Sequence, residues 1–495
     1  MIDVVKRILV ILAPVALLLA ACGGGGGGGG GDEARVVDDT ASDGGASTTT
    51  TLVEDGEMSM EQPELDAPIE PMGDPSQTGQ DDGVGADAVM ISAGLDVEAF
   101  WEQTYPEVYG EPYTALEGGF WTYGPDTAPE DLPPCDDVPA YEDIAQNAFY
   151  CPSADLIAWD REALIQPFID EFGSFAAAIV MAHEFGHAIQ GRTGDIDTLP
   201  GVVSELQADC FAGAWVARVA DGGSDNFEAE TDQLDAAVAG LIEIRDAPGS
   251  DPDDPAAHGS GFDRVSGFSD GFSDGAARCS TYGEEPPIVT EELFDAGDEA
   301  ATSGDLPTEE LLPDLVADLE DFYTQTFAAE GRTWTPVSEP EFIDPADGLT
   351  CGDVELTPEE LEFAAFYCIA DNTVYLDGVD LLPALEEIGD FAVGSELARQ
   401  WAFAAQVQLG NDENSEATFL NADCLTGLYA GDIYFELRPN SLQLSPGDLD
   451  EAIISFLAFS EGGEEADSGG SIFERSDAFR TGFLGGVADC DAFLG

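Results

Sequence analysis

The chain has 495 residues, of which 102 are Asp or Glu and only 14 are Lys or Arg, so its formal net charge is −88. This length exceeds one typical domain and allows more than one sizeable core. The charge has the wrong sign for contact with phosphate backbones, and nucleic acid is therefore not an expected partner. The acidic residues are spread along the chain, which favours a solvated surface over a dedicated attraction for cationic substrates or metal ions.

The N-terminal residues predict an export signal. Lys6 and Arg7 precede a short apolar run that ends in "LAAC", residues 19–22, which resembles the lipobox of bacterial lipoproteins. The alternative is a secretory signal that ends near a chance cysteine. We expect a signal peptide over residues 1–21, a lipid on Cys22, and a protein anchored through that lipid to the extracytoplasmic side of a cell-envelope membrane.

A polar segment follows the cysteine. Nine glycines come directly after Cys22, and the Gly-, Asp-, Ser- and Thr-rich residues beyond them include few apolar side chains. Such a composition cannot bury enough surface to fold. We expect a disordered tether over residues 22–89 and globular structure from about residue 90.

The first globular part is expected to be mostly helical and of the α+β class. "LIAWD", residues 156–160, is apolar and aromatic and predicts a short strand. The alanine-rich residues 174–190 predict a helix that Ser174 would cap and Gly191 would close. Two further helices are expected, over residues 201–220 and 228–246.

The helix expected over residues 174–190 carries the motif "HEFGH". His183 and His187 lie one helical turn apart, so both imidazoles can reach one zinc ion. Glu184 lies beside them, where it can take a proton from a water at the metal. The chain has only three histidines, so this spacing around a glutamate is rare by chance. The alternative is a structural histidine pair in the core or on the surface.

A catalytic zinc site needs a third protein ligand and an open position. In "SELQADC", Glu205 and Asp209 share one face of the next expected helix. Glu205 can supply a carboxylate oxygen, and Asp209 can accept a hydrogen bond from the other ring nitrogen of a histidine ligand. Alone, the pair would be interpreted as an exposed acidic face. Beside HExxH, it predicts the gluzincin arrangement of two histidines and a glutamate.

The third histidine, His258, opens the motif "HGSGFDRVSGF". It could replace Glu205 as a ligand, hydrogen-bond the oxyanion of a tetrahedral intermediate, or have only a structural role as an N-cap or loop residue. We expect the oxyanion role and place His258 with Glu184 among the catalytic residues. Asp263 and Arg264 have counterparts later in the chain and are interpreted as structural.

The chain repeats itself after about residue 310. Four segments align in the same order and with similar spacing: 96–105 with 318–327, 148–151 with 365–368, 208–213 with 422–427, and 262–272 with 473–483. We expect two diverged copies of one domain, over residues 90–282 and 311–495. An acidic, proline-containing linker over residues 283–310 would join them.

The cysteines fit this repeat. Apart from Cys22, each copy contains four, and an even number in an exported chain predicts disulfides. Three pairings are possible in each copy, and free buried thiols are the alternative. We expect the pairs Cys135–Cys151, Cys210–Cys279, Cys351–Cys368 and Cys424–Cys490.

The second copy lacks the residues that would carry the chemistry. The alignment places Arg399 at His183, Gln400 at Glu184, Phe403 at His187, Phe419 at Glu205 and Asp423 at Asp209. We expect no metal there. Because a lone buried aspartate is costly, Arg399 would pair with Asp423 in the metal's place, and the two phenylalanines would fill the cleft.

Three motifs of the first copy, "HEFGHAIQG", "SELQADCFAGAW" and "HGSGFDRVSGF", together resemble the bacterial family of neutral zinc metallopeptidases. The resemblance covers residues 134–279, and "FYCP" before the helix fits the same pattern. It implies a zincin-like fold, one zinc ion, His183, His187 and Glu205 as ligands, and Glu184 as base. Ala188 departs from the expected pattern without affecting the site.

The leading hypothesis is a lipid-anchored zinc metallopeptidase that hydrolyses peptide or protein substrates and has an inactive second copy. The alternative is a non-enzymatic binding or scaffold lipoprotein with a relict metal site. A zinc hydrolase of a non-peptide amide is a third interpretation. One copy has all of the site residues and the other has lost them, which favours the enzyme. If the activity were dispensable, both copies should have lost site residues to a similar extent.

Overall fold

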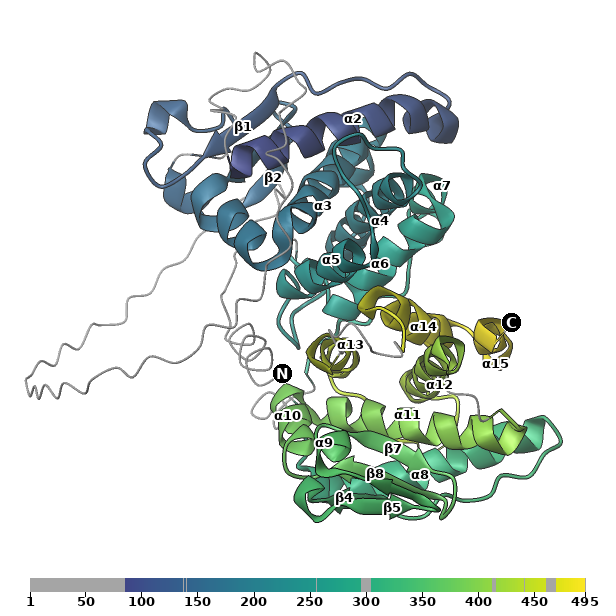
Figure 1. Ribbon diagram of the computed structural model, residues 1–495. Coiled ribbons are helices and arrows are strands. Elements are labelled where there is room, and N and C mark those ends of the chain that lie inside the picture. Colours follow the sequence, from purple (N-terminus) through teal and green to yellow (C-terminus); the bar gives the residue numbers. More distant parts are fainter. Residues whose placement is uncertain are drawn as a thin grey trace, which may run out of the picture.

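The computed structural model describes residues 85–494, apart from residues 137, 139, 255, 295–303, 412–414, 440 and 460–468. The expected signal peptide, Cys22 and nearly all of the expected tether lie outside the described residues. Residues 85–294 form a first lobe and residues 304–494 a second, stacked on it (Figure 1). Both are mostly helical with a small three-stranded sheet, as the α+β prediction requires.

The sheet of the first lobe contains β1 (Gly119–Tyr123), β2 (Ala148–Cys151) and β3 (Leu156–Asp160). β3 is central and pairs in parallel with β1 and antiparallel with β2. Its bounds are those expected from the sequence, and all of its residues are buried. β2 lies at the edge of the sheet, in contact with helix α3 (Gln166–Thr193).

Helix α3 is the centre of the first lobe, because nearly all of its side chains from Phe175 to Gln190 are buried. Burial on all faces accounts for its composition: with the preceding turn, it is the one described helix that is long and apolar enough to cross a bilayer. The other helices of the lobe are α2 (Ala86–Tyr109), α4 (Gly201–Ala220), α5 (Thr231–Glu243), α6 (Gly261–Asp274) and α7 (Ala276–Cys279). The expected bounds of α4 are confirmed.

The expected ends of α3 need correction. The helix does not close at Gly191, because that residue lies inside the last turns with the ring of Tyr150 against it. Gly194, with φ 85°, ends the helix in the left-handed region instead. At the other end, Gly173 has φ 84° and breaks the helix directly before Ser174, but helical structure also precedes this break.

Two other expected bounds were wrong. Helix α2 begins at Ala86, so the tether cannot extend to residue 89. The helix expected over residues 228–246 spans only Thr231–Glu243, because Glu230 and Gln233 form a capping box at its start.

The second lobe follows a similar course. It contains α8 (Thr308–Ala329), β4 (Glu341–Ile343), β5 (Leu349–Cys351), β6 (Val354–Leu356), α9 (Pro358–Leu361), β7 (Ala365–Cys368), β8 (Thr373–Asp377), α10 (Leu381–Ile388), α11 (Asp390–Leu409), α12 (Glu416–Tyr434), α13 (Asp448–Phe459), α14 (Ile472–Leu484) and α15 (Val487–Cys490). β8 pairs in parallel with β4 and antiparallel with β7, as β3 does with β1 and β2. Its sheet therefore has the strand arrangement of the first.

The two lobes also share close helix crossings that only glycine permits. A Cβ on Gly271 of α6 would lie 1.7 Å from the carbonyl oxygen of Cys210 on α4. A Cβ on Gly482 of α14 would lie 1.7 Å from that of Cys424 on α12. The expected disulfides Cys210–Cys279 and Cys424–Cys490 anchor these pairs, and Cys135–Cys151 and Cys351–Cys368 are also formed.

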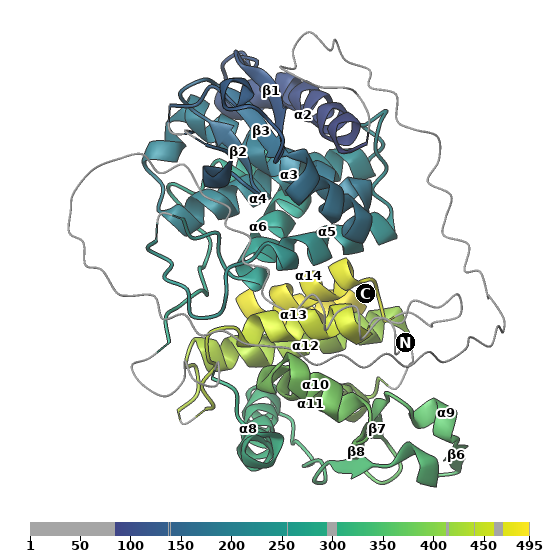
Figure 2. The same cartoon turned by 90° about the vertical axis from the view of Figure 1, so that its left-hand side faces the viewer.

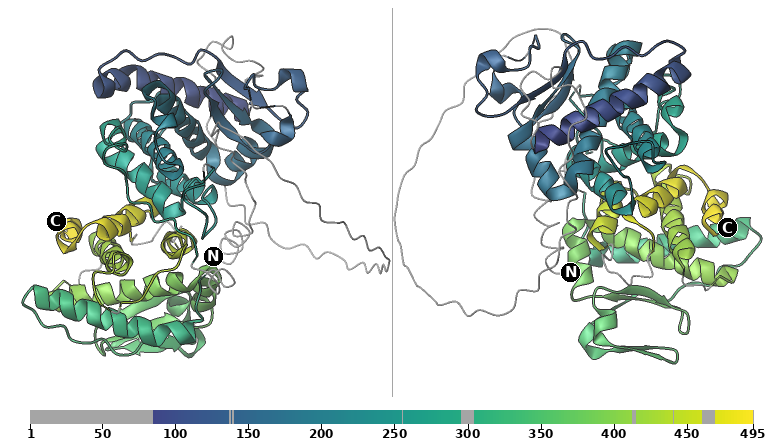
Figure 3. Two further views of the ribbon diagram at one scale, coloured as in Figure 1. Left: turned by 180° about the vertical axis from the view of Figure 1, so that it is seen from behind. Right: turned by 45° about the horizontal axis from the view of Figure 1, so that its top comes forward.

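The lobes meet at a seam in which α5 and α6 lie against α13 and α14 (Figure 2, Figure 3). Asp450 of α13 accepts hydrogen bonds from the amides of Gly261 and Phe262 at the start of α6, at 3.0 and 2.8 Å. Asp235 of α5 accepts one from the amide of Phe473 at the start of α14, at 3.0 Å. Each lobe thus supplies a carboxylate to the N-terminus of a helix in the other.

The expected linker, residues 283–310, is in part ordered structure. The amides of Thr290 and Glu291 donate to the buried carboxylate of Asp263 on α6, at 2.8 to 3.0 Å. The segment around them therefore belongs to the first lobe, and α8 begins at Thr308, inside the expected range. Composition alone indicated a linker because the anchoring aspartate is distant in sequence.

Candidate metal centre

Helix α3 brings two histidine side chains to one point. The Nε2 atoms of His183 and His187 lie 3.1 Å apart, and the exposed fraction of the His183 residue is 8%. Two imidazole nitrogens at this separation would repel unless a proton or a cation lay between them. The one-turn spacing therefore places both nitrogens where a single ion can be bound by both.

Helix α4 adds a carboxylate to this pair. The oxygens of Glu205 lie 3.2 Å from Nε2 of His183 and 3.4 Å from Nε2 of His187. The helices come this close because a Cβ on Gly186 would lie only 2.6 Å from the Cα of Ala208, so a glycine is required within HEFGH. Burial opposes ionisation, but the two histidines hold the pKa of Glu205 well below its usual range.

The three ligand atoms fit a zinc ion. Bonds of about 2.0–2.2 Å in a tetrahedron place ligand atoms roughly 3.3–3.6 Å apart. The two Nε2 atoms lie 3.1 Å apart, Oε2 of Glu205 lies 3.2 Å from that of His183, and Oε1 lies 3.4 Å from that of His187. Oε2 of Glu205 is buried without a hydrogen-bond partner, although such a group normally has one. Two nitrogens and one oxygen are also the donor set that a catalytic zinc prefers. Of the expected ligands, the structure thus brings all three together.

Asp209 lies directly behind the histidines. Its Oδ1 is 2.7 Å from Nδ1 of His183, and its carboxylate also receives bonds from Nε and Nη2 of Arg264, both at 2.9 Å. The carboxylate is completely buried. Burial alone would lower the pKa of His183, but Asp209 and Glu205 outweigh it and raise the pKa to about 10 in the absence of metal. Asp209 therefore fixes which ring nitrogen of His183 points at the ligand cluster.

The second histidine is oriented by a residue that sequence analysis missed. Nδ1 of His187 lies 2.8 Å from Oε1 of Gln190, one turn further along α3. Gln190 is held in turn by Ser204, whose hydroxyl donates to Oε1 and whose carbonyl accepts from Nε2. The available signal was the recurrence of this glutamine as Gln406, which donates to the carbonyl of Thr418 in the second lobe.

Glu184 points toward the edge strand of the sheet. Its Oε2 accepts a hydrogen bond of 2.8 Å from the amide of Tyr150 on β2. Burial raises the pKa of Glu184, and the neighbouring histidines only partly offset this effect. A carboxyl group whose proton affinity is raised beside a metal cluster suits general base and acid chemistry. Sequence analysis did not indicate the contact with Tyr150, since it joins a strand to a helix.

His258 is not among the clustered ligand atoms. Its ring Nδ1 lies 3.4 Å from Oδ1 of Asp246, and Oδ2 of Asp246 accepts bonds from the backbone amides of His258 and Gly259. The side chain is largely buried at the start of the segment that leads into α6. The loop is thus held by Asp246, and Glu205 takes the third position of the cluster.

At the corresponding point of the second lobe, Nε of Arg399 lies 2.7 Å from Oδ1 of Asp423. Asp423 is fully buried and also receives a bond from Nε of Arg475 at 2.9 Å. The guanidinium of Arg399 lies over the rings of Phe403 and Phe419, 5.3 and 5.4 Å from their centroids. The expected pair of Arg399 with Asp423 is confirmed, whereas Phe403 and Phe419 are only half-buried beside it and do not form a closed core.

Part of the first lobe is similar to a known protein family. Residues 140–282 match the family described as "Putative neutral zinc metallopeptidase". The match contains Tyr150, Glu184, Glu205 and Arg264, so the cluster described above lies inside it. The first lobe therefore has the sequence features of a zinc-dependent peptidase, which is a hydrolase that acts on peptide or protein substrates.

Curated relatives share the same region. An uncharacterized protein of Mycobacterium tuberculosis is 30% identical over 152 residues, which are 28% of this chain and 46% of that protein. The uncharacterized protein YpfJ of Escherichia coli is 31% identical over 165 residues, 28% of this chain and 54% of YpfJ. The chain thus spans about half the length of the curated relatives it matches. No solved structure matches the chain significantly.

Proposed function

We propose that the first lobe is a single-zinc metallopeptidase in which His183, His187 and Glu205 hold the ion. The observation that carries the proposal is the set of separations, 3.1, 3.2 and 3.4 Å, among two imidazole nitrogens and one carboxylate. These separations, which involve both oxygens of Glu205, are close to the distances between ligands of a tetrahedral zinc ion, and three protein ligands leave its fourth position to a water or a substrate. When bound, zinc supplies the Lewis acidity and the acidification of water that amide hydrolysis requires.

The residues around the cluster divide the remaining work. Glu184 takes the proton of the attacking water and returns it to the leaving amine, because its pKa is raised by burial and its carboxylate is held by the Tyr150 amide. Asp209 and Gln190 keep the Nε2 atoms of the two histidines turned inward. His258 is assigned the stabilisation of the developing oxyanion, with Asp246 fixing its loop.

An extended peptide is the substrate form that suits this site. β2 pairs with only one described strand, β3, and the Tyr150 amide on its other side points at Glu184. A peptide that adds to this free edge by backbone hydrogen bonds would place a scissile carbonyl beside Glu184. The same edge would exclude compact folded substrates, which cannot present an extended segment.

We also propose that the chain is an exported lipoprotein, anchored through Cys22, whose second lobe is a copy of the first without a metal site. Support for the anchor comes from the "LAAC" segment and the polar residues after it. Support for the duplication comes from the shared strand arrangement, disulfide pattern and glycine crossings. The pair of Arg399 and Asp423 supports the absence of a metal in the second lobe.

The decisive experiment combines metal analysis with peptide hydrolysis. The full chain, dialysed against a weak chelator, is expected to retain one zinc ion and to cleave a mixture of unstructured peptides. Glu184→Gln should retain the zinc but lower kcat by about 10²–10⁴-fold. Glu396→Gln, the same change on α11 of the second lobe, is the matched control and should leave both unchanged. A chain without zinc, or activity that survives Glu184→Gln, would contradict the proposal.

A further inference from the structure

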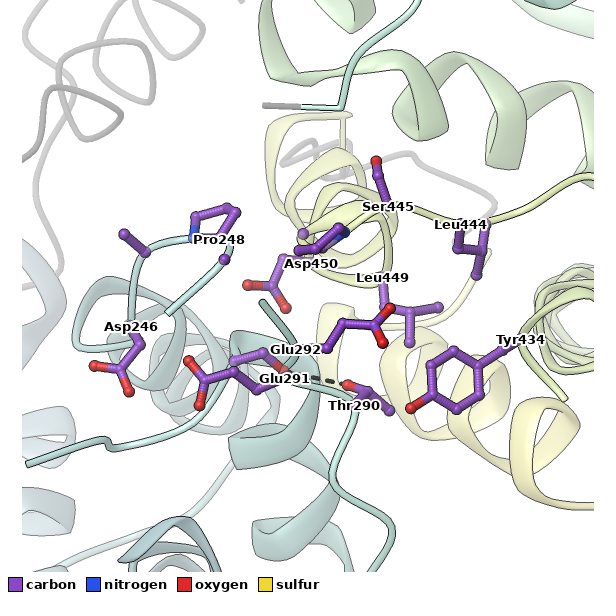
Figure 4. Close-up of a pocket in the computed structure, with 15 residues that line it drawn as sticks. Asp246, Pro248, Thr290, Glu291, Glu292, Tyr434, Leu444, Ser445, Leu449 and Asp450 are labelled. Atoms are coloured by element: carbon purple, nitrogen blue, oxygen red, sulfur yellow. Dashed lines mark hydrogen bonds between the residues drawn. The ribbon is translucent and has the colours of Figure 1, made fainter. Parts of the chain in front are cut away.

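A polar pocket, separate from the candidate metal centre, lies at the seam, behind the loop that carries His258. Its walls come from the loop after α5, the segment 290–292, and the region 444–450 of the second lobe (Figure 4). The space between these walls, open solvent included, is about 430 Å³. The polar lining includes side chains that can offer oxygen ligands: Asp246, Ser260, Thr290, Glu291, Glu292, Tyr434, Ser445 and Asp450. The pocket shares no lining residue with the zinc ligands.

Glu291 is the unusual member of this lining. Its exposed fraction is 8%, yet neither carboxylate oxygen receives a bond from an amide, hydroxyl or cationic donor among the described residues. Its one side-chain neighbour is the carboxyl group of Asp246, with which it can bond only by sharing a proton. The backbone of the segment is fixed by Asp263, which accepts bonds from the amides of Thr290 and Glu291. The side chain is therefore held in place, and its carboxyl group points toward Asp246 (Figure 4). An ionised carboxylate buried in this way is normally paired with a cation.

The surrounding charges leave Glu291 unbalanced. Burial, followed by the negative charges of Asp246, Asp263 and Asp450, raises the pKa of Glu291 to about 8. Among the carboxylates of the pocket, Asp450 forms an ion pair with Arg245 at 3.2 Å, and Asp246 contacts His258. Oδ2 of Asp246 accepts bonds from the amides of His258 and Gly259, and its Oδ1 lies 3.4 Å from Nδ1 of His258. Without a cation, Asp246 and Glu291 therefore share a proton near neutral pH, and a divalent cation between them could take the place of that proton.

We propose that this pocket binds a calcium ion between the carboxylates of Glu291 and Asp246. The hydroxyls of Ser260 and Thr290 and bound waters would complete its oxygen shell, with Asp450 across the seam as an outer charge. Calcium accepts six to eight oxygen ligands in irregular geometry, whereas magnesium needs a near-ideal octahedron and zinc prefers nitrogen or sulfur. The inference goes beyond the proposed peptidase activity and does not depend on it.

Bound calcium would connect three parts of the molecule. Glu291 belongs to the segment that leaves the first lobe, and Asp246 holds the loop of His258. Asp450 of the second lobe lines the same pocket and accepts bonds from the start of α6. A cation there would stabilise the seam and the His258 loop together.

The test is calcium binding by the full chain with its zinc retained. With only two carboxylates, the affinity expected is in the range of about 10⁻⁴–10⁻³ M, typical of weak calcium modules. In calcium-buffered solutions with 0.1 M salt as a background, saturating calcium should raise the melting temperature by about 2–4 °C relative to a chelator. Direct titration with calcium chloride gives the dissociation constant independently of stability.

Glu291→Gln should weaken this binding at least about tenfold and remove the calcium-dependent rise in melting temperature. In the chelator, the same variant should melt at or above the temperature of the unmodified chain, because it no longer buries an unpaired carboxylate. This opposite sign separates a calcium ligand from a residue that is merely structural.

Two control variants complete the design. Glu243→Gln removes another partly buried carboxylate of the first lobe, whose pKa burial raises to about 7, and should keep the full calcium response. Asp390→Asn alters a separate cluster of carboxylates, Asp305, Asp390 and Glu451, whose oxygens lie within 4.8 Å of one another. A response that survives Glu291→Gln, or that disappears with Asp390→Asn instead, would overturn the proposal, as would the absence of any calcium binding.

Discussion

The two lobes bury an aspartate at the same crossing of helices and neutralise it differently. In the first lobe Asp209 lies between His183 and Arg264, and in the second Asp423 lies between Arg399 and Arg475. The arginine on the later helix is common to both, so the pair of aspartate with that arginine belongs to the fold. Only the partner on the α3 or α11 side changes, from an imidazole to a guanidinium.

The change of partner from an imidazole to a guanidinium distinguishes the residues that the fold requires from those that a metal site would require. Asp209 performs two roles, since it holds Arg264 and also orients His183, whereas Asp423 serves two arginines. The second lobe keeps its helices in the same arrangement without an imidazole or a carboxylate at the ligand positions. The metal residues of the first lobe are therefore not a requirement of folding.

The largest effect is expected from making the first lobe resemble the second. His183→Arg should reduce zinc from about one ion per chain to none and abolish peptide hydrolysis, because the ligand is lost and the cation enters its place. The guanidinium can pair with Asp209, so the unfolding free energies of the zinc-free variant and the zinc-free unmodified chain should differ by less than about 1 kcal/mol. Zinc analysis and denaturant unfolding measure the two outcomes.

The reverse substitution is the control for that variant. Arg399→His should bind no zinc, because Phe403 and Phe419 stand where the other ligands would be. Zinc binding by this variant would show that the surroundings of residue 399 can still hold a metal, contrary to the expectation.

A smaller, purely structural effect is expected from Asp423→Asn. It leaves Arg399 and Arg475 buried without a carboxylate and should lower the free energy of unfolding by about 3–5 kcal/mol. Asp321→Asn removes an exposed partner of Arg438 and should cost less than about 1 kcal/mol. Equal costs, measured by urea unfolding, would mean that burial of the pair does not matter.

Asp209→Asn tests the role that the second lobe lacks. Weaker orientation of His183 should lower zinc affinity by about 10–100-fold while all three ligands remain. Competition with a chromophoric chelator measures this change. An unaltered affinity would limit Asp209 to its pairing with Arg264.

The smallest effect concerns pH. Burial and Asp390 raise the pKa of Asp448 to about 8, and burial raises that of Asp390 to about 6. A raised carboxyl pKa means that the folded state keeps a proton that the unfolded state releases, so stability falls as pH rises from about 4 to about 8. The opposite holds for Asp209, whose lowered pKa stabilises only above its unfolded value near 3.8.

We therefore expect the free energy of unfolding in calcium-free buffer to fall between pH 5 and pH 8. Asp448→Asn should reduce this fall by about 1–2 kcal/mol, measured by denaturant unfolding across the range. A slope that the variant does not alter would place the responsible proton elsewhere.

Local patterns predicted the parts of the molecule that depend on neighbours in sequence. The bounds of β3 and α4 follow from apolar composition and caps, and the convergence of His183 and His187 follows from helical spacing alone. Glu205 could be found because it lies on the next helix of the chain. The pairing of Arg399 with Asp423 could be predicted because the repeat supplied the comparison.

The missed features all depend on distant contacts. Gly191 is of the residue type that commonly ends a helix, but Tyr150 packs against it and the helix continues to Gly194. The amide of Tyr150 reaches Glu184 only because β2 lies at the edge of the sheet. Glu291 lies in a segment that composition assigned to a linker, and only Asp263, 28 positions earlier, places it in the seam.

The reciprocal hydrogen bonds at the seam have a consequence for how the first lobe associates with the second. Asp450 and Asp235 join helix ends of lobes that one chain carries, so their association is unimolecular. Its effective concentration, on the order of millimolar for tethered modules, does not fall when the protein is diluted. A separate partner would dissociate from the first lobe at low abundance. Here the face formed by α5 and α6 remains covered at any concentration of the protein.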